Sequence, residues 1–403
     1  MPVSRCHNIA DLRELARRRL PAPIFHYLHG GAEDEWTQAA NTRAFDAYPL
    51  LPSCLNDVSR IELETRVFGQ RLRWPVMLSP TGMNRLFHHH GERAVARAAA
   101  STGTLHGLST MATTSLEEIA TIAGDAPRMF QVYIFKDRGL TAEFLQRCRA
   151  AGYQVLCLTV DTPVAGNRER DRRSGFTMPP RPTLGSLRSF MMRPGWLVNL
   201  LRYPDFRLAN VAHRVDALGR GPLSIIDYVN SQFDPSVTWR DVEWLQREWN
   251  GPLVLKGVQA PADARRAADM GLAGVMVSNH GGRQLDGAAA AVDCIPRIVD
   301  AVADRLDVVL DGGVRRGSHV VKALALGAKA CSIGRPYLYG LAAGGESGVV
   351  RAIEILREEV RRTMALLGVT SVQQLSKRFI HRHPLAQQPP ENAHAQILRA
   401  TCG

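Results

Sequence analysis

The stretch Ser278–Asp286, Ser-Asn-His-Gly-Gly-Arg-Gln-Leu-Asp, combines side chains that could do chemistry. His280 follows an apolar run, and two glycines separate it from Arg283. A histidine is readily neutral and basic near pH 7, and an arginine offers a planar fork that binds a carboxylate in two parallel hydrogen bonds. A base beside an anion clamp suits a small carboxylic acid whose neighbouring carbon or hydroxyl must lose a proton. A buried histidine and a surface arginine after an ordinary strand would explain the pair alone equally well.

Eight apolar runs typical of buried strands recur along the chain, with amphipathic helix patterns between them. The helix patterns include Glu92–Ser101, Ala262–Met270 and Ser318–Leu326. This alternation predicts a parallel sheet covered by helices, and eight such units close an α/β (β/α)8 TIM barrel. An open doubly wound sheet fits less well, because no Gly-x-Gly-x-x-Gly turn follows an early strand. The eight runs are Pro75–Thr81, Thr104–Thr110, Met129–Ile134, Val155–Val160, Leu253–Val258, Gly274–Ser278, Val308–Asp311 and Ala330–Ile333.

Reactive side chains follow these runs, and in a closed barrel they would meet on the face where TIM-barrel enzymes keep their active sites. The last two strands are followed by Asp311-Gly312-Gly313-Val314-Arg315 and Gly334-Arg335. Glycines there would let backbone N–H groups approach an anion, and the two arginines would add charge-assisted hydrogen bonds. We therefore expect a phosphate-bearing ligand at these two strand ends.

The composition limits the possible partners and compartments. The chain has 403 residues, with 50 Lys+Arg and 38 Asp+Glu, so the formal net charge is +12. This balance is compatible with nucleic acid, an anionic membrane or anionic ligands. The seven cysteines form no Cys-x-x-Cys pair, which favours a reducing compartment. No signal peptide and no apolar run of about 18 residues is found, so we expect a cytoplasmic protein that does not span a membrane.

The chain has three segments outside the repeating pattern. Residues 8–48 predict a helical extension before the barrel. Residues 174–250, after the fourth strand, are too long for an ordinary connection between a strand and a helix. Within them, residues 181–220 interleave apolar and aromatic side chains with seven arginines against two aspartates, as a membrane-surface segment would. A lid or a subunit contact is the alternative. Residues 381–403 predict a loose tail.

With these residues in place, the chain resembles the FMN-dependent L-2-hydroxy acid oxidase and dehydrogenase family over about residues 8–380, as one domain that includes the 174–250 insertion. The insertion, with Arg193-Pro194-Gly195-Trp196, looks most like that of the membrane-associated bacterial L-lactate and (S)-mandelate dehydrogenases. The most specific motif is Ser278–Asp286. It is joined by Pro80-Thr81-Gly82, Gln131-Val132-Tyr133, Leu158–Pro163, Leu255-Lys256-Gly257 and Asp311–Arg315.

The resemblance implies a catalytic set. His280 would be the base, and Asp161 would pair with it and stabilise the imidazolium that forms. Arg168 and Arg283 would clamp the substrate carboxylate. Two tyrosines, Tyr27 and Tyr133, would hydrogen-bond substrate oxygens and complete the catalytic set.

The resemblance also implies FMN as the cofactor. Lys256 would lie against the N1/C2 carbonyl edge of the flavin and offset negative charge there. The full set of residues implied to bind FMN is Pro80, Thr81, Gly82, Ser109, Gln131, Thr159, Lys256, Ser278, Asp311, Gly312, Gly313, Arg315, Gly334 and Arg335. No metal is expected, because His88-His89-His90 lacks a carboxylate or thiolate at ligand spacing.

The implied activity is oxidation of a small lactate- or mandelate-like L-2-hydroxy acid to the 2-oxo acid. Electrons would pass to a quinone or another carrier, in a homotetramer or other homo-oligomer that contacts the inner face of the cell membrane through 181–220. Three departures concern the substrate side: Gly82 stands where many oxidases have Ala, Met111 replaces an aromatic residue of plant-type oxidases, and Asn167 before the clamp is atypical.

The sequence leaves three alternatives to this function. Within the family, the alternatives are a soluble oxidase that uses O2 and a member recruited to a larger or peptide substrate. A basic nucleic-acid- or membrane-binding module is the alternative from another class, but it would leave His280, Asp161 and Arg283 without a purpose, and no nucleic-acid motif is recognisable. We therefore expect no nucleic-acid partner.

Overall fold

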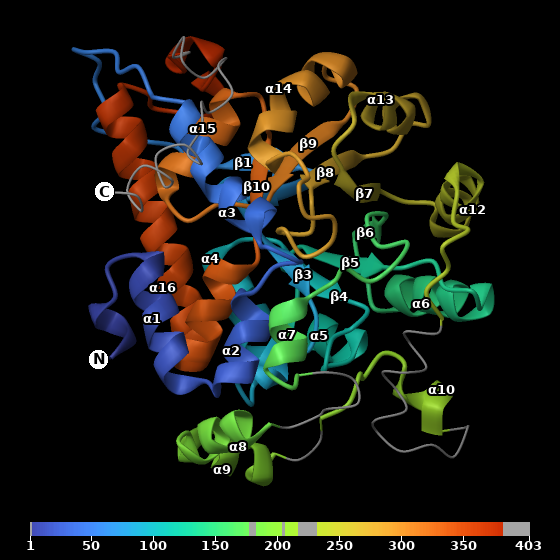
Figure 1. Cartoon of the computed structure of the whole chain (residues 1–403). Helices are drawn as coiled ribbons and strands as arrows, with labels where there is room; N and C mark the ends of the chain where they lie inside the picture. The colour runs from blue at the N-terminus through green and yellow to red at the C-terminus, as the bar shows by residue number, and fades with distance from the viewer. Residues whose placement is uncertain (1, 177–182, 204–205, 217–231, 382–403) are drawn as a thin grey trace, which may run out of the picture.

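The centre of the protein is a closed barrel of eight parallel strands (Figure 1). The computed structural model describes residues 2–176, 183–203, 206–216 and 232–381. Each of the eight predicted runs overlaps one barrel strand, so the predicted TIM barrel is confirmed. In barrel order the strands are β10 (Ala330–Ile333), β3 (Val76–Thr81), β4 (His106–Ser109), β5 (Arg128–Val132), β6 (Val155–Thr159), β7 (Leu253–Val258), β8 (Gly274–Ser278) and β9 (Asp307–Asp311).

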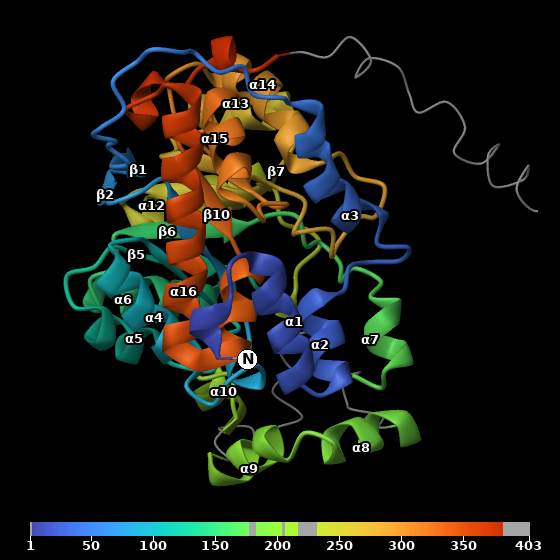
Figure 2. The same cartoon turned by 90° about the vertical axis from the view of Figure 1, so that its left-hand side faces the viewer.

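Amphipathic helices cover the outside of the barrel. In α14, for example, Ile295, Ile298 and Val302 are all buried, at the three- and four-residue spacing that puts side chains on one helix face. Residues 344–345 interrupt the helical geometry of α16, the helix that runs along the barrel (Figure 2). The covering helices are α4 (Gly91–Thr102), α5 (Leu116–Ala123), α6 (Arg138–Ala150), α12 (Trp239–Trp249), α13 (Pro261–Asp269), α14 (Ala291–Val302), α15 (Gly317–Ala325) and α16 (Arg335–Leu367).

The N-terminal extension is helical, as predicted, and packs on the barrel. Its helices are α1 (Ile9–Arg19), α2 (Ala22–His29) and α3 (Trp36–Arg43). The Asn8 side chain caps α1 by accepting a hydrogen bond from the backbone N–H of Asp11, and α1 lies beside α16 (Figure 2). The extension therefore brings α2 and α3 to the barrel without joining the sheet.

A short antiparallel hairpin closes the amino-terminal end of the barrel, and sequence reasoning did not find it. Its strands are β1 (Thr65–Val67) and β2 (Gln70–Leu72), joined by Phe68 and Gly69, both at positive φ. Phe68 is buried in a cluster with side chains from the barrel strands. Three-residue strands are too short to give a clear alternating pattern.

Among the described residues, the segment between β6 and α12 contains four helices. They are α7 (Glu169–Arg173), α8 (Leu184–Met191), α9 (Pro194–Arg202) and α10 (Ala212–Asp216). In Figures 1 and 2, α8 and α9 lie at the lower edge of the molecule, below α2. Parts of the predicted 181–220 segment, and the predicted tail apart from His381, lie outside the described residues. No helix within the described ranges has both the length and the apolar character needed to cross a membrane.

Candidate active site

His280 and Asp161 meet at the carboxyl end of the barrel. The Nδ1 atom of His280 lies 2.9 Å from Oδ1 of Asp161. Burial raises the pKa of Asp161, but the neighbouring His280 and Lys256 lower it by more, so the pKa lies below its ordinary value. An ionised carboxylate accepts only, so His280 carries its proton on Nδ1 and leaves Nε2 as the basic nitrogen.

An unusual backbone turn presents the histidine. His280 has φ of 56°, and the two glycines that follow have φ of 65° and 73°. Few residues other than glycine adopt this left-handed backbone region, and the exceptions gather at functional sites. A Cβ on Gly282 would lie 2.4 Å from the backbone nitrogen of Gln38 in α3. The glycines of the motif therefore serve both the turn and the close approach of the N-terminal extension.

Two arginines converge on one tyrosine. The guanidinium carbons of Arg283 and Arg168 lie 4.9 Å and 5.6 Å from the centre of the Tyr27 ring. Arg283 also donates to the backbone carbonyl oxygens of Tyr27 at 2.7 Å and of Gly30 at 3.0 Å. Burial of the guanidinium and the charge of Arg168 both lower the pKa of Arg283. Two neighbouring cations under these conditions favour an anionic ligand.

Asp171 lies beside this arginine pair and was missed by the sequence reasoning. Its carboxylate is 3.8 Å from Nε of Arg168, and the residue is 6% exposed. Burial raises the pKa of Asp171, although Arg283 and Arg168 act in the opposite direction. The sequence does contain a signal for this contact: an acidic residue follows Arg168 by three positions, a spacing that puts two side chains on the same face of a helix.

Aromatic side chains surround the two predicted tyrosines. The Tyr27 ring lies 4.9 Å from Phe176 and 6.3 Å from Phe87, and the Tyr133 ring lies 4.9 Å from Phe233. Burial raises the pKa of Tyr133, so its phenol stays protonated and can donate a hydrogen bond.

A buried ion pair lies among the carboxyl ends of the barrel strands. Nζ of Lys256 lies 3.1 Å from Oδ2 of Asp311, and Ser278 and Ser79 donate to the same carboxylate at 2.7 Å and 2.9 Å. Burial alone would lower the pKa of Lys256, but Asp311 and Asp161 raise it above its ordinary value. Lys256 is therefore held as a cation inside the barrel mouth.

The neighbouring strand ends offer polar atoms that fit a flavin ring. Ser109 donates to Oε1 of Gln131 at 3.0 Å, which orients the amide. Nε2 of Gln131 is buried and has no hydrogen-bond partner within the described residues, which is costly unless a ligand accepts its proton. Thr159 is buried at the end of the next strand, and Thr81 contacts Asn84 at 2.8 Å.

The ends of β9 and β10 are strongly basic. Arg335 donates to the carbonyl oxygens of Gly281 and Gly30, each at 2.8 Å, while its Nε is buried without a partner in the described part of the chain. Burial lowers the pKa of Arg335 to about 9, and the charges of Arg315 and Arg283 act in the same direction. Arg335 also begins α16, whose amino-terminal end favours an anion. These features fit a phosphate group.

Two predicted cofactor glycines prove to be packed against protein. A Cβ on Gly313 would lie 2.0 Å from the carbonyl oxygen of Asn41, so this glycine lets the N-terminal extension approach. A Cβ on Gly82 would lie 2.8 Å from Cβ of Met111. Other residues missing from the predicted set include Tyr337, whose hydroxyl contacts Thr81 at 2.6 Å.

The histidine triplet does come together in space. The imidazole nitrogens of His88, His89 and His90 lie within 4.8 Å of one another. Burial lowers the pKa of His88 to about 4, and burial lowers that of His89 and His90 as well. Arg85 adds to the lowering at His89 and Arg97 to that at His90, whereas Glu346, the ion-pair partner of Arg97, acts in the opposite direction at His90. The absence of a metal at this triplet stays a prediction.

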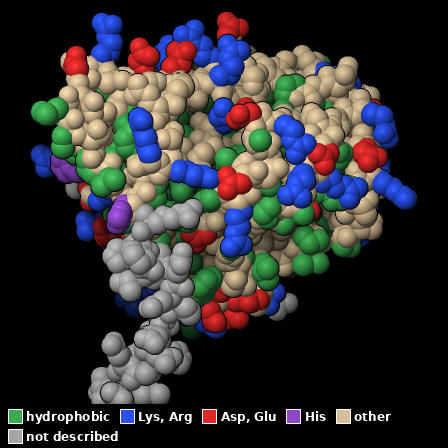
Figure 3. All heavy atoms as spheres, turned by 90° about the horizontal axis from the view of Figure 1, so that it is seen from above, with side chains coloured by type: hydrophobic (Ala, Val, Ile, Leu, Met, Phe, Trp, Pro, Cys, Tyr) green, Lys and Arg blue, Asp and Glu red, His purple; other side chains and the backbone are tan. Residues whose placement is uncertain are grey.

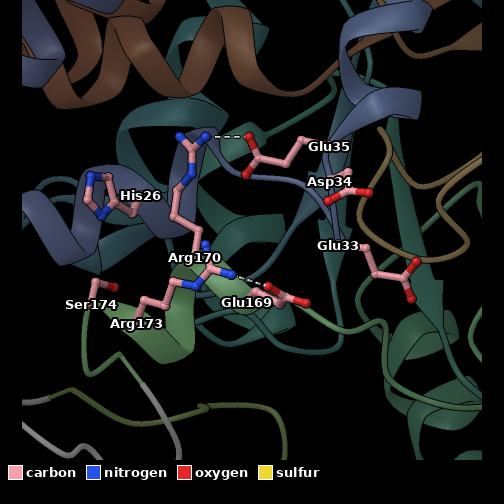
Figure 4. Close-up of a pocket in the computed structure, with 8 residues that line it drawn as sticks. All are labelled: His26, Glu33, Asp34, Glu35, Glu169, Arg170, Arg173 and Ser174. Carbon is pink, nitrogen blue, oxygen red and sulfur yellow. Dashed lines mark hydrogen bonds and ion pairs between the residues drawn. The ribbon is translucent and has the colours of Figure 1, made fainter.

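A cavity of about 400 Å³ lies between α2 and α7. Figure 4 shows it lined by His26 of α2, by three acidic side chains of residues 33–35, and by α7, including the Glu169–Arg173 ion pair at 2.5 Å. None of the predicted catalytic or cofactor residues lines it.

Comparison with known proteins gives the family. A family model described as FMN-dependent dehydrogenase matches residues 16–382. An L-lactate oxidase from Nostoc sp. is 44% identical over 382 residues, covering 94% of this chain and 99% of that protein. An L-lactate dehydrogenase from Caulobacter vibrioides is 43% identical over 377 residues, covering 93% of this chain and 97% of that protein. The chain belongs to the FMN-dependent dehydrogenase family.

A solved structure agrees with this placement. The crystal structure of the monotopic membrane protein (S)-mandelate dehydrogenase matches with a TM-score of 0.90 and 35% identity, covering 94% of this chain and 100% of that chain. The predicted family, its FMN cofactor and its FMN-dependent oxidation of 2-hydroxy acids are confirmed. The relatives' names include both oxidases and dehydrogenases, so the electron acceptor varies among them.

Proposed function

We propose that this enzyme oxidises a small L-2-hydroxy acid to the 2-oxo acid, with His280 as the base. One observation supports this most directly: the His280–Asp161 pair and the two arginines over Tyr27 are presented by the same two loops, after β6 and β8. A carboxylate held by the arginines would place the neighbouring hydroxyl and carbon beside the base.

The roles follow from the chemistry of each group. Nε2 of His280 takes the proton from the hydroxyl or from the α-carbon, and both routes need the same base. Asp161 stabilises the resulting imidazolium, and it is already ionised because its pKa lies below the ordinary value. The protonated phenol of Tyr133, together with Tyr27, donates a hydrogen bond to a substrate oxygen.

The cofactor would lie across the strand ends. Gln131 would hydrogen-bond the ring through its buried Nε2, Lys256 would offset negative charge, and Arg315 and Arg335 would bind the phosphate. When bound, FMN supplies the acceptor for the two electrons that leave the substrate. The remaining predicted cofactor residues, Pro80, Thr81, Gly82, Ser109, Thr159, Ser278, Asp311, Gly312, Gly313 and Gly334, stay a prediction.

Anaerobic spectroscopy tests the activity. Purified protein should show a flavin absorption band that bleaches on addition of L-lactate or (S)-mandelate and not with the D- or (R)-forms. Bleaching by neither enantiomer of either acid, in protein that holds FMN, would contradict the proposed substrate class.

We also propose that α8 and α9 contact an anionic membrane surface. Large apolar side chains are exposed on them, with Leu184 at 88%, Leu201 at 73% and Met191 at 70%. Residues 183–216, apart from 204–205, contain five arginines and one aspartate, and apolar side chains among basic residues suit the interface of anionic lipids. The face at the other end of the molecule, by contrast, intersperses basic and acidic side chains (Figure 3).

Each of the two helices is hydrogen-bonded to the rest of the protein: α9 to the loop after β3, and α8 to the start of α2. Nε1 of Trp196 donates to the carbonyl oxygen of Leu86 at 2.8 Å. The hydroxyl of Ser189 accepts from the backbone N–H of Ala22 at 2.8 Å. The likeness to a solved protein that is described as monotopic supports the same proposal.

Vesicle sedimentation tests the membrane contact. We expect salt-sensitive binding to anionic vesicles that is lost in the double variant Leu184→Glu, Leu201→Glu, while the control Leu366→Glu, at another exposed leucine (72%), still binds. Equal binding by both variants would contradict the proposed surface. Membrane binding would bring the reduced cofactor close to membrane quinones, so a quinone or another carrier would serve as electron acceptor. Rapid oxygen use without vesicle binding would favour a soluble oxidase instead.

Two further predictions complete the proposal. We take residues 8–380 as one catalytic domain with the 174–250 insertion, at the inner face of the cell membrane. We expect a homotetramer or another homo-oligomer, and light scattering during size-exclusion chromatography measures its mass. A monomer would contradict this expectation.

A further inference from the structure

Gln284 belongs to the Ser278–Asp286 motif, yet it has no part in the proposed proton transfer, carboxylate binding or cofactor binding. Both the nitrogen and the oxygen of its side-chain amide form hydrogen bonds with one neighbouring loop. Nε2 donates to the carbonyl oxygens of Asp161 at 3.0 Å and Val164 at 2.9 Å. Oε1 accepts from the backbone N–H of Gly166 at 3.0 Å. Three hydrogen bonds therefore join this one side chain to residues 161–166.

The loop so held carries functional groups at both ends. It begins with Asp161, which pairs with the base, and leads to Arg168, one arm of the arginine clamp. Gln284 itself directly follows Arg283, the other arm. The amide thus connects the loop after β6 with the loop after β8.

The backbones of the two loops also touch. A Cβ on Gly166 would lie 2.1 Å from the carbonyl oxygen of Arg283, so only glycine permits this approach. Val164, in the same loop, is 68% exposed, so little apolar burial holds that part of the loop in place. Hydrogen bonds from a neighbouring side chain must then supply much of its order.

We propose that Gln284 is a positioning residue that fixes the Asp161 carboxylate against His280 and Arg168 against Arg283. This inference rests on the proposed roles of those four groups. Reacting groups must be held within a fraction of an ångström, and a misplacement of about 1 Å can lower a rate by roughly a hundredfold. Gln284 touches none of the reacting atoms, so it acts through the two loops.

The test compares Gln284→Met, which keeps the length of the side chain and removes its hydrogen bonds, with Gln284→Asn, which keeps the amide and shortens its reach. Gln246→Met is the control, because Gln246 on α12 also donates its side-chain amide to a backbone carbonyl, that of Met270 at 3.0 Å, away from the two loops. Each protein is loaded with FMN. Three quantities are measured: hydrogen exchange of the peptide that contains residues 161–168, the dissociation constant of L-lactate, and the anaerobic rate of flavin bleaching.

We expect faster exchange in residues 161–168 for both Gln284 variants, with weaker substrate binding and a bleaching rate lower by roughly tenfold to a hundredfold. The control should match wild type in all three. Faster exchange with an unchanged rate and affinity would overturn the proposal, because the amide would then order the loop without positioning the reacting groups. A lower rate with unchanged exchange would overturn it as well. Wild-type protein that no L-2-hydroxy acid bleaches would instead overturn the proposed function, and this inference with it.

Discussion

Nδ1 of His280 and Oδ1 of Asp161 lie 2.9 Å apart, although the two residues are 119 positions apart in the chain. The barrel makes this contact possible, because β6 and β8 both end at the same face. The contact fixes the histidine tautomer and leaves Nε2 available to a substrate.

Asp161→Asn tests the charge of this pair. The amide keeps the shape of the side chain but does not stabilise an imidazolium, so the bleaching rate should fall by roughly a hundredfold while FMN stays bound. Because the pKa of Asp161 lies below its ordinary value of 3.8, we expect the carboxylate to stay ionised at all pH values above about 5. A rate within twofold of wild type would show that the aspartate only orients the ring.

Arg283→Lys tests the clamp. Lysine keeps the positive charge but loses the planar fork, so both the affinity for the hydroxy acid and the bleaching rate should fall, each by roughly tenfold or more. Arg305→Lys is the control, since Arg305 forms an exposed ion pair with Asp269 at 2.5 Å. If both quantities change by less than twofold, the substrate carboxylate is bound elsewhere.

Asp311→Asn tests the buried ion pair. It removes the carboxylate that contacts the buried cation of Lys256, so the free energy of unfolding at neutral pH should fall by about 3–5 kcal/mol. Burial raises the pKa of Asp311, but Lys256 and Ser278 lower it by more, so it lies below the ordinary 3.8. A group with a lowered pKa contributes stability above its unfolded pKa and loses it as the pH falls. The difference between wild type and variant should therefore shrink below about pH 4 in urea unfolding. A difference that is constant with pH would contradict this account.

Gly82→Ala tests the packing beside the predicted flavin. The new Cβ would lie 2.8 Å from Cβ of Met111, so overpacking should cost about 1–3 kcal/mol in the free energy of unfolding. Adding Met111→Gly should recover part of this loss, because it removes the Cβ atom that the new methyl group meets. A single variant as stable as wild type would mean that the Met111 segment moves freely.

Much of the barrel could be predicted from the sequence. Buried parallel strands are apolar along their whole length, so the runs before Thr81, Lys256 and His280 are visible without a structure. The residues after the runs could be grouped because all strand ends of a barrel meet at one face. The family resemblance then supplied Arg168 and Tyr27, which no strand pattern marks.

Contacts that depend on packing between distant segments could not be predicted. The close approach of Asn41 to Gly313, and the hydrogen bonds of Gln284 to the loop after β6, involve backbone atoms that any sequence possesses. The hairpin turn at Phe68 was missed because its strands are only three residues long. In the insertion, composition indicated the exposed apolar and basic character, whereas the helices α8 and α9 were not predicted.

Single-turnover bleaching of His280→Ala protein by L-lactate or (S)-mandelate, in the absence of oxygen, tests the central claim most directly. The variant should bind FMN and be bleached slower than wild type by several orders of magnitude, because no other base in the described part of the chain occupies that position. His213→Ala is the control, since His213 pairs with Glu143 at 2.7 Å away from the strand ends and should leave the rate unchanged. A yellow His280→Ala protein that is bleached at nearly the wild-type rate would contradict the assignment of His280 as the base.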